Sequence, residues 1–153
     1  MSIYPSPVQI PFDERILARS WNWLQDPELK RLTDTPEFTR DAQRSWFDSL
    51  ADRADYFAWG IEVDGKLIGA FGLKHVTSDE AEYWGYLGEK AYWGRGIGQW
   101  MLERATAEGR RLDLRRLRLR VLRENVRAIA AYERFGYRTD SISGLHALMS
   151  IAV

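Results

Sequence analysis

The segment Gly94-Arg95-Gly96-Ile97-Gly98, which we call the glycine loop, has the spacing most suggestive of ligand chemistry, and a helical pattern of apolar residues follows it. A glycine has no Cβ, so its backbone N–H can approach a ligand closely. The first turn of a helix adds unpaired amides and the positive end of the helix dipole. Together these features predict a binding site for a phosphate or a diphosphate.

Two common phosphate-binding motifs do not fit this loop. An NTPase P-loop ends in Gly-Lys-Ser/Thr, which the sequence does not supply. A dinucleotide fingerprint reads Gly-x-Gly-x-x-Gly, whereas Gly96 is followed by Ile97-Gly98-Gln99. Asp113 lies at a suitable distance for a ribose-binding acid, but it precedes an expected strand instead of ending one. A purely structural turn remains the alternative interpretation of the three glycines.

A second segment, from Asn125 to Tyr137, carries side chains that share one helical face. Asn125, Ala128 and Tyr132 are spaced i, i+3 and i+7, which places them on the same side of a helix. A polar cap, a small residue and a phenol on one face suit a thin ligand that lies against the helix.

The elements that would position these residues are read from hydrophobic periodicity. We expect helices over residues 16–24, from Pro27 with Asp26 as its cap, from Thr39 to about Ala51, directly after the glycine loop, and from Val126 to Arg134. We expect strands over residues 8–10, 56–63, 66–76, 81–87 and 117–121, and again from Tyr137 to Val153. Asp64-Gly65 predicts a two-residue hairpin turn. This order predicts an α/β fold with a mixed sheet in one domain, residues 1–153.

Composition narrows the class of protein. The hydrophobic fraction is 45% and the formal net charge is zero, which argues against non-specific binding to nucleic acid or to a membrane surface. No apolar run has the length of a membrane span, and the first residues lack the pattern of a secretory signal, so we expect a cytoplasmic protein. With no cysteine, and with His75 and His146 far apart, we expect no metal site.

The two segments together resemble the GNAT superfamily of acyl-CoA-dependent N-acetyltransferases. The pattern Arg/Gln-x-x-Gly-x-Gly/Ala falls on Trp93 to Gly98, and the pattern Asn-x-x-Ala-x-x-x-Tyr-x-x-x-Gly-Phe/Tyr falls on Asn125 to Tyr137 without a gap. The resemblance covers roughly residues 56–137. Trp93 departs from the Gln or Arg of many members, and this form is similar to the branch that includes ribosomal-protein N-terminal acetyltransferases of the Rim type.

The resemblance implies a GNAT fold and acetyl-CoA as co-substrate. The sheet would be mostly antiparallel, flanked by helices and splayed at the cofactor site, with backbone groups of Leu87 and Gly88 holding the pantetheine arm. The amides of Gly94, Arg95, Gly96, Ile97 and Gly98 would hold the diphosphate. The Arg95 side chain adds charge there or points to solvent. Asn125 contacts the cofactor, caps its helix, or does both.

The resemblance also implies two catalytic residues. Glu82 lies fourteen residues before Gly96, where family members that use a strand carboxylate as general base carry it; the alternative is that Glu82 faces solvent or a basic partner. Tyr132 occupies the position of the family's tyrosine, which protonates the departing thiolate; the alternative is a core tyrosine with a satisfied hydroxyl. Glu80 and Glu89 are weaker candidates because we expect them in turns.

The acceptor is the least constrained part of this interpretation. The stretches around Trp23 and Trp46 look like a subgroup that acts on amino sugars, which favours the primary amine of a small molecule. A protein N-terminal acetyltransferase of the Rim type is the alternative within the family, and a non-catalytic acyl-CoA-binding module is the alternative of another class. Among relatives a homodimer is common.

Overall fold

The sheet is the framework of the molecule. The structure is a computed structural model that describes residues 6–153, and within these residues seven strands form one sheet in the order β1-β2-β3-β4-β5-β7-β6. The strands are β1 (Val8–Pro11), β2 (Phe57–Val63), β3 (Lys66–Lys74), β4 (Glu80–Leu87), β5 (Arg116–Leu122), β6 (Arg138–Ser143) and β7 (His146–Ala152). The pairs β1–β2, β2–β3, β3–β4, β5–β7 and β6–β7 are antiparallel, and β4–β5 is parallel.

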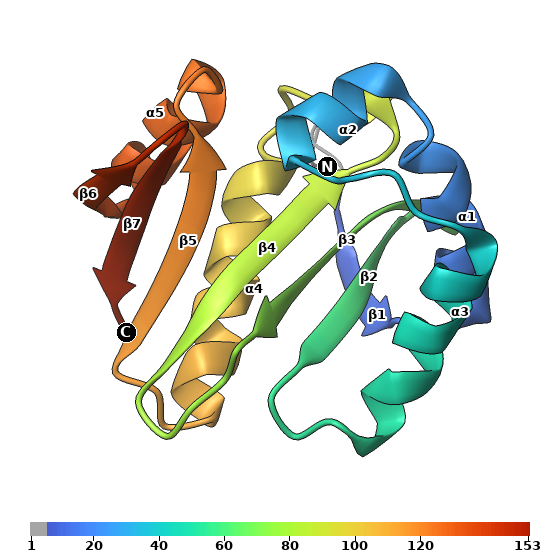
Figure 1. Ribbon diagram of the computed structural model, residues 1–153, viewed down its shortest axis with the longest axis horizontal. Coiled ribbons are helices and arrows are strands. Elements are labelled where there is room, and N and C mark those ends of the chain that lie inside the picture. Colours follow the sequence, from blue (N-terminus) through green and yellow to red (C-terminus); the bar gives the residue numbers. More distant parts are fainter. Residues whose placement is uncertain (1–5) are drawn as a thin grey trace.

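The parallel pair splits the sheet. β4 and β5 are joined by only three residue pairs, Glu80–Arg116, Ala81–Leu117 and Glu82–Arg118. Beyond Glu82 the two strands diverge toward their C-terminal ends, as Figure 1 shows for the yellow-green β4 and the orange β5. The splayed sheet expected from the family resemblance is therefore confirmed. We call the gap between β4 and β5 beyond Glu82 the splay.

Helices cover the two faces of the sheet. They are α1 (Glu14–Trp23), α2 (Pro27–Thr33), α3 (Arg40–Ser49), α4 (Ile97–Arg111) and α5 (Val126–Phe135), with short 3₁₀ turns η1 (Leu50–Asp52) and η2 (Lys90–Tyr92). On β4, a Cβ built on Gly85 would lie 2.7 Å from Met101 of α4, whereas Tyr86 points the other way and contacts Trp23 of α1. α4 and α1 therefore lie on opposite faces of the sheet, consistent with Figure 1.

Local sequence signals explain where the helices begin. The Asp26 carboxylate accepts a hydrogen bond from the Leu29 amide at 3.0 Å, and the Thr39 hydroxyl accepts one from the Ala42 amide at 3.0 Å. Both caps were predicted, because these side chains satisfy amides that the helix leaves unpaired. The Asp64-Gly65 hairpin is also confirmed, and both residues have the positive φ that such a turn requires (50° and 80°).

Two expectations are wrong in detail. Glu80 is the first residue of β4 and not part of a turn, because it pairs with Arg116 of β5. The helix expected from Thr39 to about Ala51 begins at its predicted cap, but it is an α-helix only to Ser49, continues as η1 to Asp52, and has no fully buried residue in its α-helical part. Trp46 instead packs edge-on against Phe12 and Tyr56, at ring-centroid distances of 5.3 and 5.8 Å.

The main core lies between the sheet and α4. It includes Phe71, Leu117 and Met149, all with no exposed surface, and Ile97 at the start of α4, which is 2% exposed. The first helical residue after the glycine loop is thus fixed by packing. Across residues 6–153, no helix combines the length and the apolar character needed to cross a membrane.

Candidate active site

The glycine loop joins η2 to α4 in a conformation that suits glycine. Gly94 and Gly96 have φ values of 75° and 83°, in the left-handed region that other residues rarely adopt. Gly96 is also the N-cap of α4, and no side chain caps that helix end. The loop therefore presents backbone, and not side chains, at the positive end of a fifteen-residue helix.

The amides of the glycine loop have no acceptor within the part of the chain that the structure describes. The amides just before the loop are used, since Tyr92 N–H donates to Glu89 and Trp93 N–H to Lys90. The helical hydrogen bonds begin with Trp100 N–H, which donates to the Gly96 carbonyl at 3.2 Å. Between them, the N–H groups of residues 94–98 make no hydrogen bond with residues 6–153. Unpaired amides at a helix N-terminus fit a diphosphate.

Gly98 adds a second observation that points to a ligand. A Cβ built on Gly98 would meet no atom within 4 Å, and its backbone does not need a positive φ. Packing and backbone conformation therefore give no reason for glycine inside the first turn of a helix, where it costs about 0.5–1 kcal/mol relative to alanine. Close approach by a bound group would give such a reason.

Two hydrogen bonds fix the end of β4, one to β3 and one to the residue that precedes the glycine loop. Gly88 N–H donates to the Ile68 carbonyl of β3 at 2.8 Å, and the Trp93 indole N–H donates to the Leu87 carbonyl at 2.9 Å. Because backbone groups alternate in direction along a strand, those of Leu87 point to the opposite side from those of Gly88, toward β5. Of the two predicted contacts to the pantetheine arm, the Leu87 N–H faces the gap between β4 and β5, whereas the Leu87 carbonyl is used by Trp93 and the Gly88 amide by β3.

Positive charge surrounds the loop without entering it. The Arg95 guanidinium lies 5.7 Å from the centre of the Tyr92 ring, and the Lys66 ammonium lies 5.9 Å from the same ring. Arg95 is exposed, so its side chain is held over Tyr92 at the surface of the loop. Both cations contribute to a field that favours an anionic ligand.

α5 brings Asn125 and Tyr132 to the other side of the splay. The Asn125 side chain accepts a hydrogen bond from the Ala128 amide at 3.3 Å, so its capping role is confirmed, and its contact with the cofactor stays a prediction. Tyr132 packs against Tyr83 of β4 and against Tyr137, at ring-centroid distances of 6.5 and 5.9 Å. The phenol thus lies beside the first β4 residue that follows the last pair with β5.

Burial keeps these phenols protonated. Removal from water raises the pKa of Tyr132 to about 12, and it raises the pKa of Tyr83 well above its usual value. A tyrosine with such a pKa is an intact proton donor at neutral pH. The Tyr137 hydroxyl is buried and has no hydrogen-bond partner among residues 6–153.

Glu82 marks the point where the sheet divides. It forms the last β4–β5 pair, with Arg118, and its side chain is 18% exposed. The Lys74 ammonium lies 3.5 Å from the Glu82 carboxylate, so the basic partner considered in the sequence analysis is present. Burial, and to a smaller extent the nearby Glu82 charge, raise the pKa of Tyr56 to about 12. Glu82 thus lies on the face that carries α1–α3, whereas Tyr132 lies on the face that carries α4.

Two of the three arginines of β5 (Arg116, Arg118 and Arg120) contact side chains of neighbouring elements. Arg118 lies 2.9 Å from the Glu80 carboxylate, and an Arg120 N–H donates to Nδ1 of His146 at 3.1 Å. Nε2 of His146 lies 2.7 Å from the carboxylate of Asp34, the C-cap residue of α2. These contacts connect α2 with β5 and β7 across the splay.

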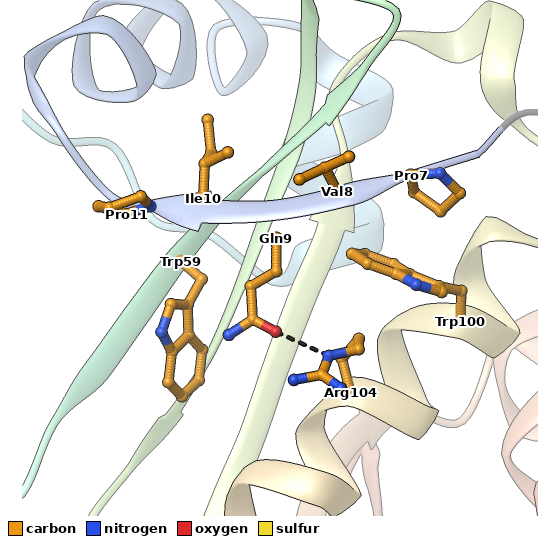
Figure 2. A pocket seen from close by; sticks show the side chains of 8 residues that line it. All are labelled: Pro7, Val8, Gln9, Ile10, Pro11, Trp59, Trp100 and Arg104. Atoms are coloured by element: carbon orange, nitrogen blue, oxygen red, sulfur yellow. Dashed lines mark hydrogen bonds between the residues drawn. The ribbon is translucent and has the colours of Figure 1, made fainter.

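A hollow of about 560 Å³ lies away from these residues, between β1 and α4. Figure 2 shows Trp59, Trp100 and Arg104 on one side of it, with the Arg104 guanidinium donating to Gln9 at 2.9 Å. None of the predicted site residues lines this hollow.

Comparison with known proteins agrees with this geometry. Residues 17–137 match the Acetyltransferase (GNAT) family, and the chain therefore belongs to that family. It is an acetyltransferase that uses acetyl-CoA as co-substrate. No curated protein sequence matches the chain.

Solved structures show the same fold at low sequence identity. A domain from Methanocaldococcus jannaschii is 16% identical with a TM-score of 0.87, over 97% of this chain and 99% of that one. The spermidine N-acetyltransferase from Vibrio cholerae, in complex with CoA and spermine, is 18% identical with a TM-score of 0.85, over 95% of each chain. The N-acetyltransferase PseH from Campylobacter jejuni, in complex with acetyl coenzyme A, is 12% identical with a TM-score of 0.74, over 96% of this chain and 99% of that one.

Two residues beside the site were missed by sequence reasoning. The Trp93 indole bonds the end of β4, and Lys90 forms ion pairs with Asp26 and Glu28 at the start of α2. Trp93 was noted only as a departure from the family pattern. The partner of Lys90 lies 64 residues away in the sequence, and no local spacing indicates it.

Replacing Gly98 should separate stability from cofactor binding. Gly98→Ala should leave the free energy of unfolding unchanged or raise it by up to about 1 kcal/mol, because alanine favours the helix and the site has room. The same change should weaken CoA binding about tenfold or more, because the methyl group occupies the approach to the amides. Urea unfolding and titration calorimetry with CoA measure the two effects. A variant that binds CoA as tightly as the wild type would show that no ligand comes close to residue 98.

Proposed function

We propose that the protein transfers the acetyl group of acetyl-CoA to the primary amine of a small molecule, with an amino sugar as the candidate class. One observation carries the proposal. The point where β4 and β5 separate has a carboxylate, Glu82, on one face and a protonated phenol, Tyr132, on the other. The glycine loop, with its unpaired amides, follows at the end of β4.

The cofactor is held largely by backbone. The amides of residues 94–98 bind the diphosphate, with the dipole of α4 behind them. Leu87 offers its backbone N–H to the pantetheine arm, since its carbonyl is bonded to Trp93, and Asn125 lies at the N-terminus of α5 on the far side. When bound, acetyl-CoA supplies an acetyl thioester. Because the contacts come from fixed backbone groups, little ordering of side chains is needed.

Glu82 acts as the general base in this proposal. An amine is mostly protonated at neutral pH and attacks only after it loses a proton. Glu82 accepts that proton, directly or through a water, and the Lys74 ammonium at 3.5 Å holds the carboxylate in place. Tyr132 acts at the other face and donates its phenolic proton to the thiolate that leaves.

The surroundings of Glu82 suit an ammonium group on a compact scaffold. Tyr56, Trp84 and Tyr86 follow one another on the same face, with ring-centroid distances of 6.2 and 6.5 Å between neighbours. Aromatic faces attract a cation and accept the apolar face of a sugar ring. The structurally similar Vibrio cholerae enzyme was solved in complex with spermine, which supports a small amine over a peptide as the acceptor. A peptide N-terminus, as in the Rim-type enzymes, is the second candidate acceptor. We place the protein in the cytoplasm and propose a homodimer by analogy with relatives.

A panel of amines tests the proposal directly. Release of free thiol from acetyl-CoA should be fastest with an amino sugar and slower with polyamines, amino acids and a peptide that has a free N-terminus. If turnover is highest with the peptide, the acceptor is a protein N-terminus and not a small molecule. CoA binding without thiol release for any amine would favour the non-catalytic alternative.

Replacing Tyr132 tests the proton donor. Tyr132→Phe should lower kcat about 100-fold, because it removes the proton but keeps the ring, and it should change the affinity for CoA less than twofold. Tyr137→Phe is the matched control, since it removes a neighbouring buried hydroxyl that has no partner among residues 6–153. Equal turnover in the two variants would remove Tyr132 from the mechanism.

Replacing Glu82 tests the base. Glu82→Gln should lower kcat about 100-fold and abolish the acidic limb of the pH–rate profile, because the amide cannot take up a proton. Glu80→Gln, two residues away and beside Arg118, should keep both the rate and the profile of the wild type. If the Glu82→Gln profile matches that of the control, another group is the base.

A further inference from the structure

Trp93 fixes the start of the glycine loop. Its indole N–H donates to the carbonyl of Leu87 at 2.9 Å. This hydrogen bond joins the two ends of the segment that leads from β4 to the glycine loop. The ring is partly buried. The residue immediately before Gly94 is thus attached to the strand that borders the splay.

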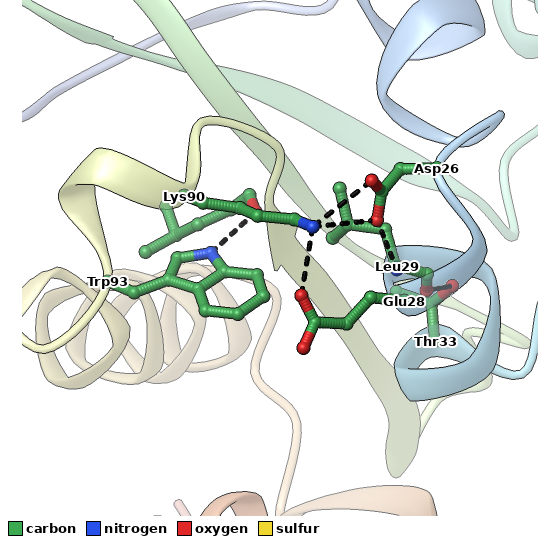
Figure 3. A network of polar contacts seen from close by, with 7 residues as sticks. Asp26, Glu28, Leu29, Thr33, Lys90 and Trp93 are labelled. Atoms are coloured by element: carbon green, nitrogen blue, oxygen red, sulfur yellow. Dashed lines mark hydrogen bonds and ion pairs between the residues drawn. The ribbon is translucent and has the colours of Figure 1, made fainter.

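Lys90 attaches the same segment to α2. Its ammonium lies 3.0 Å from the carboxylate of Asp26 and 2.9 Å from that of Glu28. It also lies 5.9 Å from the centre of the Trp93 ring. Figure 3 shows the Lys90 side chain between Trp93 and the two carboxylates. The hydrogen bond to Glu28, followed by that to Asp26, raises the pKa of Lys90, so the ammonium stays charged at neutral pH. We call Asp26, Glu28, Lys90 and Trp93 the clamp.

The glycine loop depends on its two ends for order. Gly94 and Gly96 have the largest conformational freedom of any residue type, and the loop amides make no hydrogen bonds within residues 6–153. At the C-terminal end, Ile97 is 2% exposed and is fixed in the core. At the N-terminal end, the clamp provides the corresponding attachment.

We propose that Trp93 and Lys90 are positioning residues, which hold the glycine loop in the shape that binds the diphosphate. The inference rests on the diphosphate site proposed above. A loop that is ordered before binding loses less conformational entropy when the ligand arrives. α2, whose first turn carries the two acidic residues of the clamp, is thereby part of the support of the cofactor site.

The test compares acetyl-CoA with a donor that lacks the diphosphate and the nucleoside attached to it. Trp93→Phe keeps the ring and removes the hydrogen bond to Leu87, and it should raise the Kd of CoA and the KM of acetyl-CoA about five- to tenfold, with kcat changed less than twofold. With S-acetyl-pantetheine, which has no diphosphate, the variant should match the kcat/KM of the wild type. Lys90→Met should show the same pattern at about two- to threefold, because its ion pairs are partly exposed.

Matched controls separate the clamp from general damage. Trp21→Phe changes another half-buried indole, which packs on Phe38, and Lys30→Met breaks the ion pair with Glu37. Both should bind CoA as the wild type does. The melting temperature of each variant reports whether the fold is intact.

Two outcomes would overturn the inference. One is a Trp93→Phe variant with the CoA affinity of the wild type. The other is an equal loss with acetyl-CoA and with S-acetyl-pantetheine, which would indicate a structural role only. A wild-type protein that does not bind CoA would instead refute the diphosphate site itself.

Discussion

The short pairing between β4 and β5 is the constraint on which the rest of the site depends. A parallel pair that continued along the whole of β4 would use the backbone of Leu87 and would leave no gap between the two strands. Because the pairing ends at Glu82, β4 carries a carboxylate at the point where the two strands separate. The backbone of β4 after Glu82 has no partner in β5. α4 is the crossover that a parallel connection requires, and its N-terminus is directed at the same end of the sheet.

The anion site that we propose consists of main-chain amides, so its chemistry does not depend on the side chain at position 93. Trp93 stands where the family pattern has glutamine or arginine, yet the amides after it make no hydrogen bond within residues 6–153. Charge from Arg95 and Lys66 lies around the loop, packed on Tyr92, and not within it. Affinity for a diphosphate then follows from geometry and from the dipole of α4, while nearby side chains are free to hold the loop in place.

Local chemistry made much of the fold predictable from sequence. Asp26 and Thr39 act as caps through contacts three residues away, and Asp64-Gly65 specifies its turn through positive φ. The glycine loop was identified for the same reason. Features that depend on partners distant in the sequence could not be predicted from the sequence. The direction of the Gly88 amide depends on β3, and the position of Glu80 depends on β5.

For the site as well, features within one element were predictable from sequence, and contacts between elements were not. Spacing along one helix placed Asn125 and Tyr132 correctly on α5, because both belong to one element. The Lys74 contact with Glu82 and the Lys90 contact with Asp26 join separate elements, and they arise only when the chain folds. Long flexible side chains at the surface have many candidate partners, and sequence does not choose among them.

The contacts at both ends of α2 have a mechanical consequence. Its N-cap, Asp26, is bonded to Lys90 beside β4, and its C-cap, Asp34, is bonded to His146 at the start of β7. A helix of seven residues is a rigid rod about 10 Å long. α2 therefore spans the gap between the two halves of the sheet and is attached to both of them. The two contacts thus add a surface connection at the open end of the gap, opposite the end where the β4–β5 pairs and the core on α4 hold the halves together.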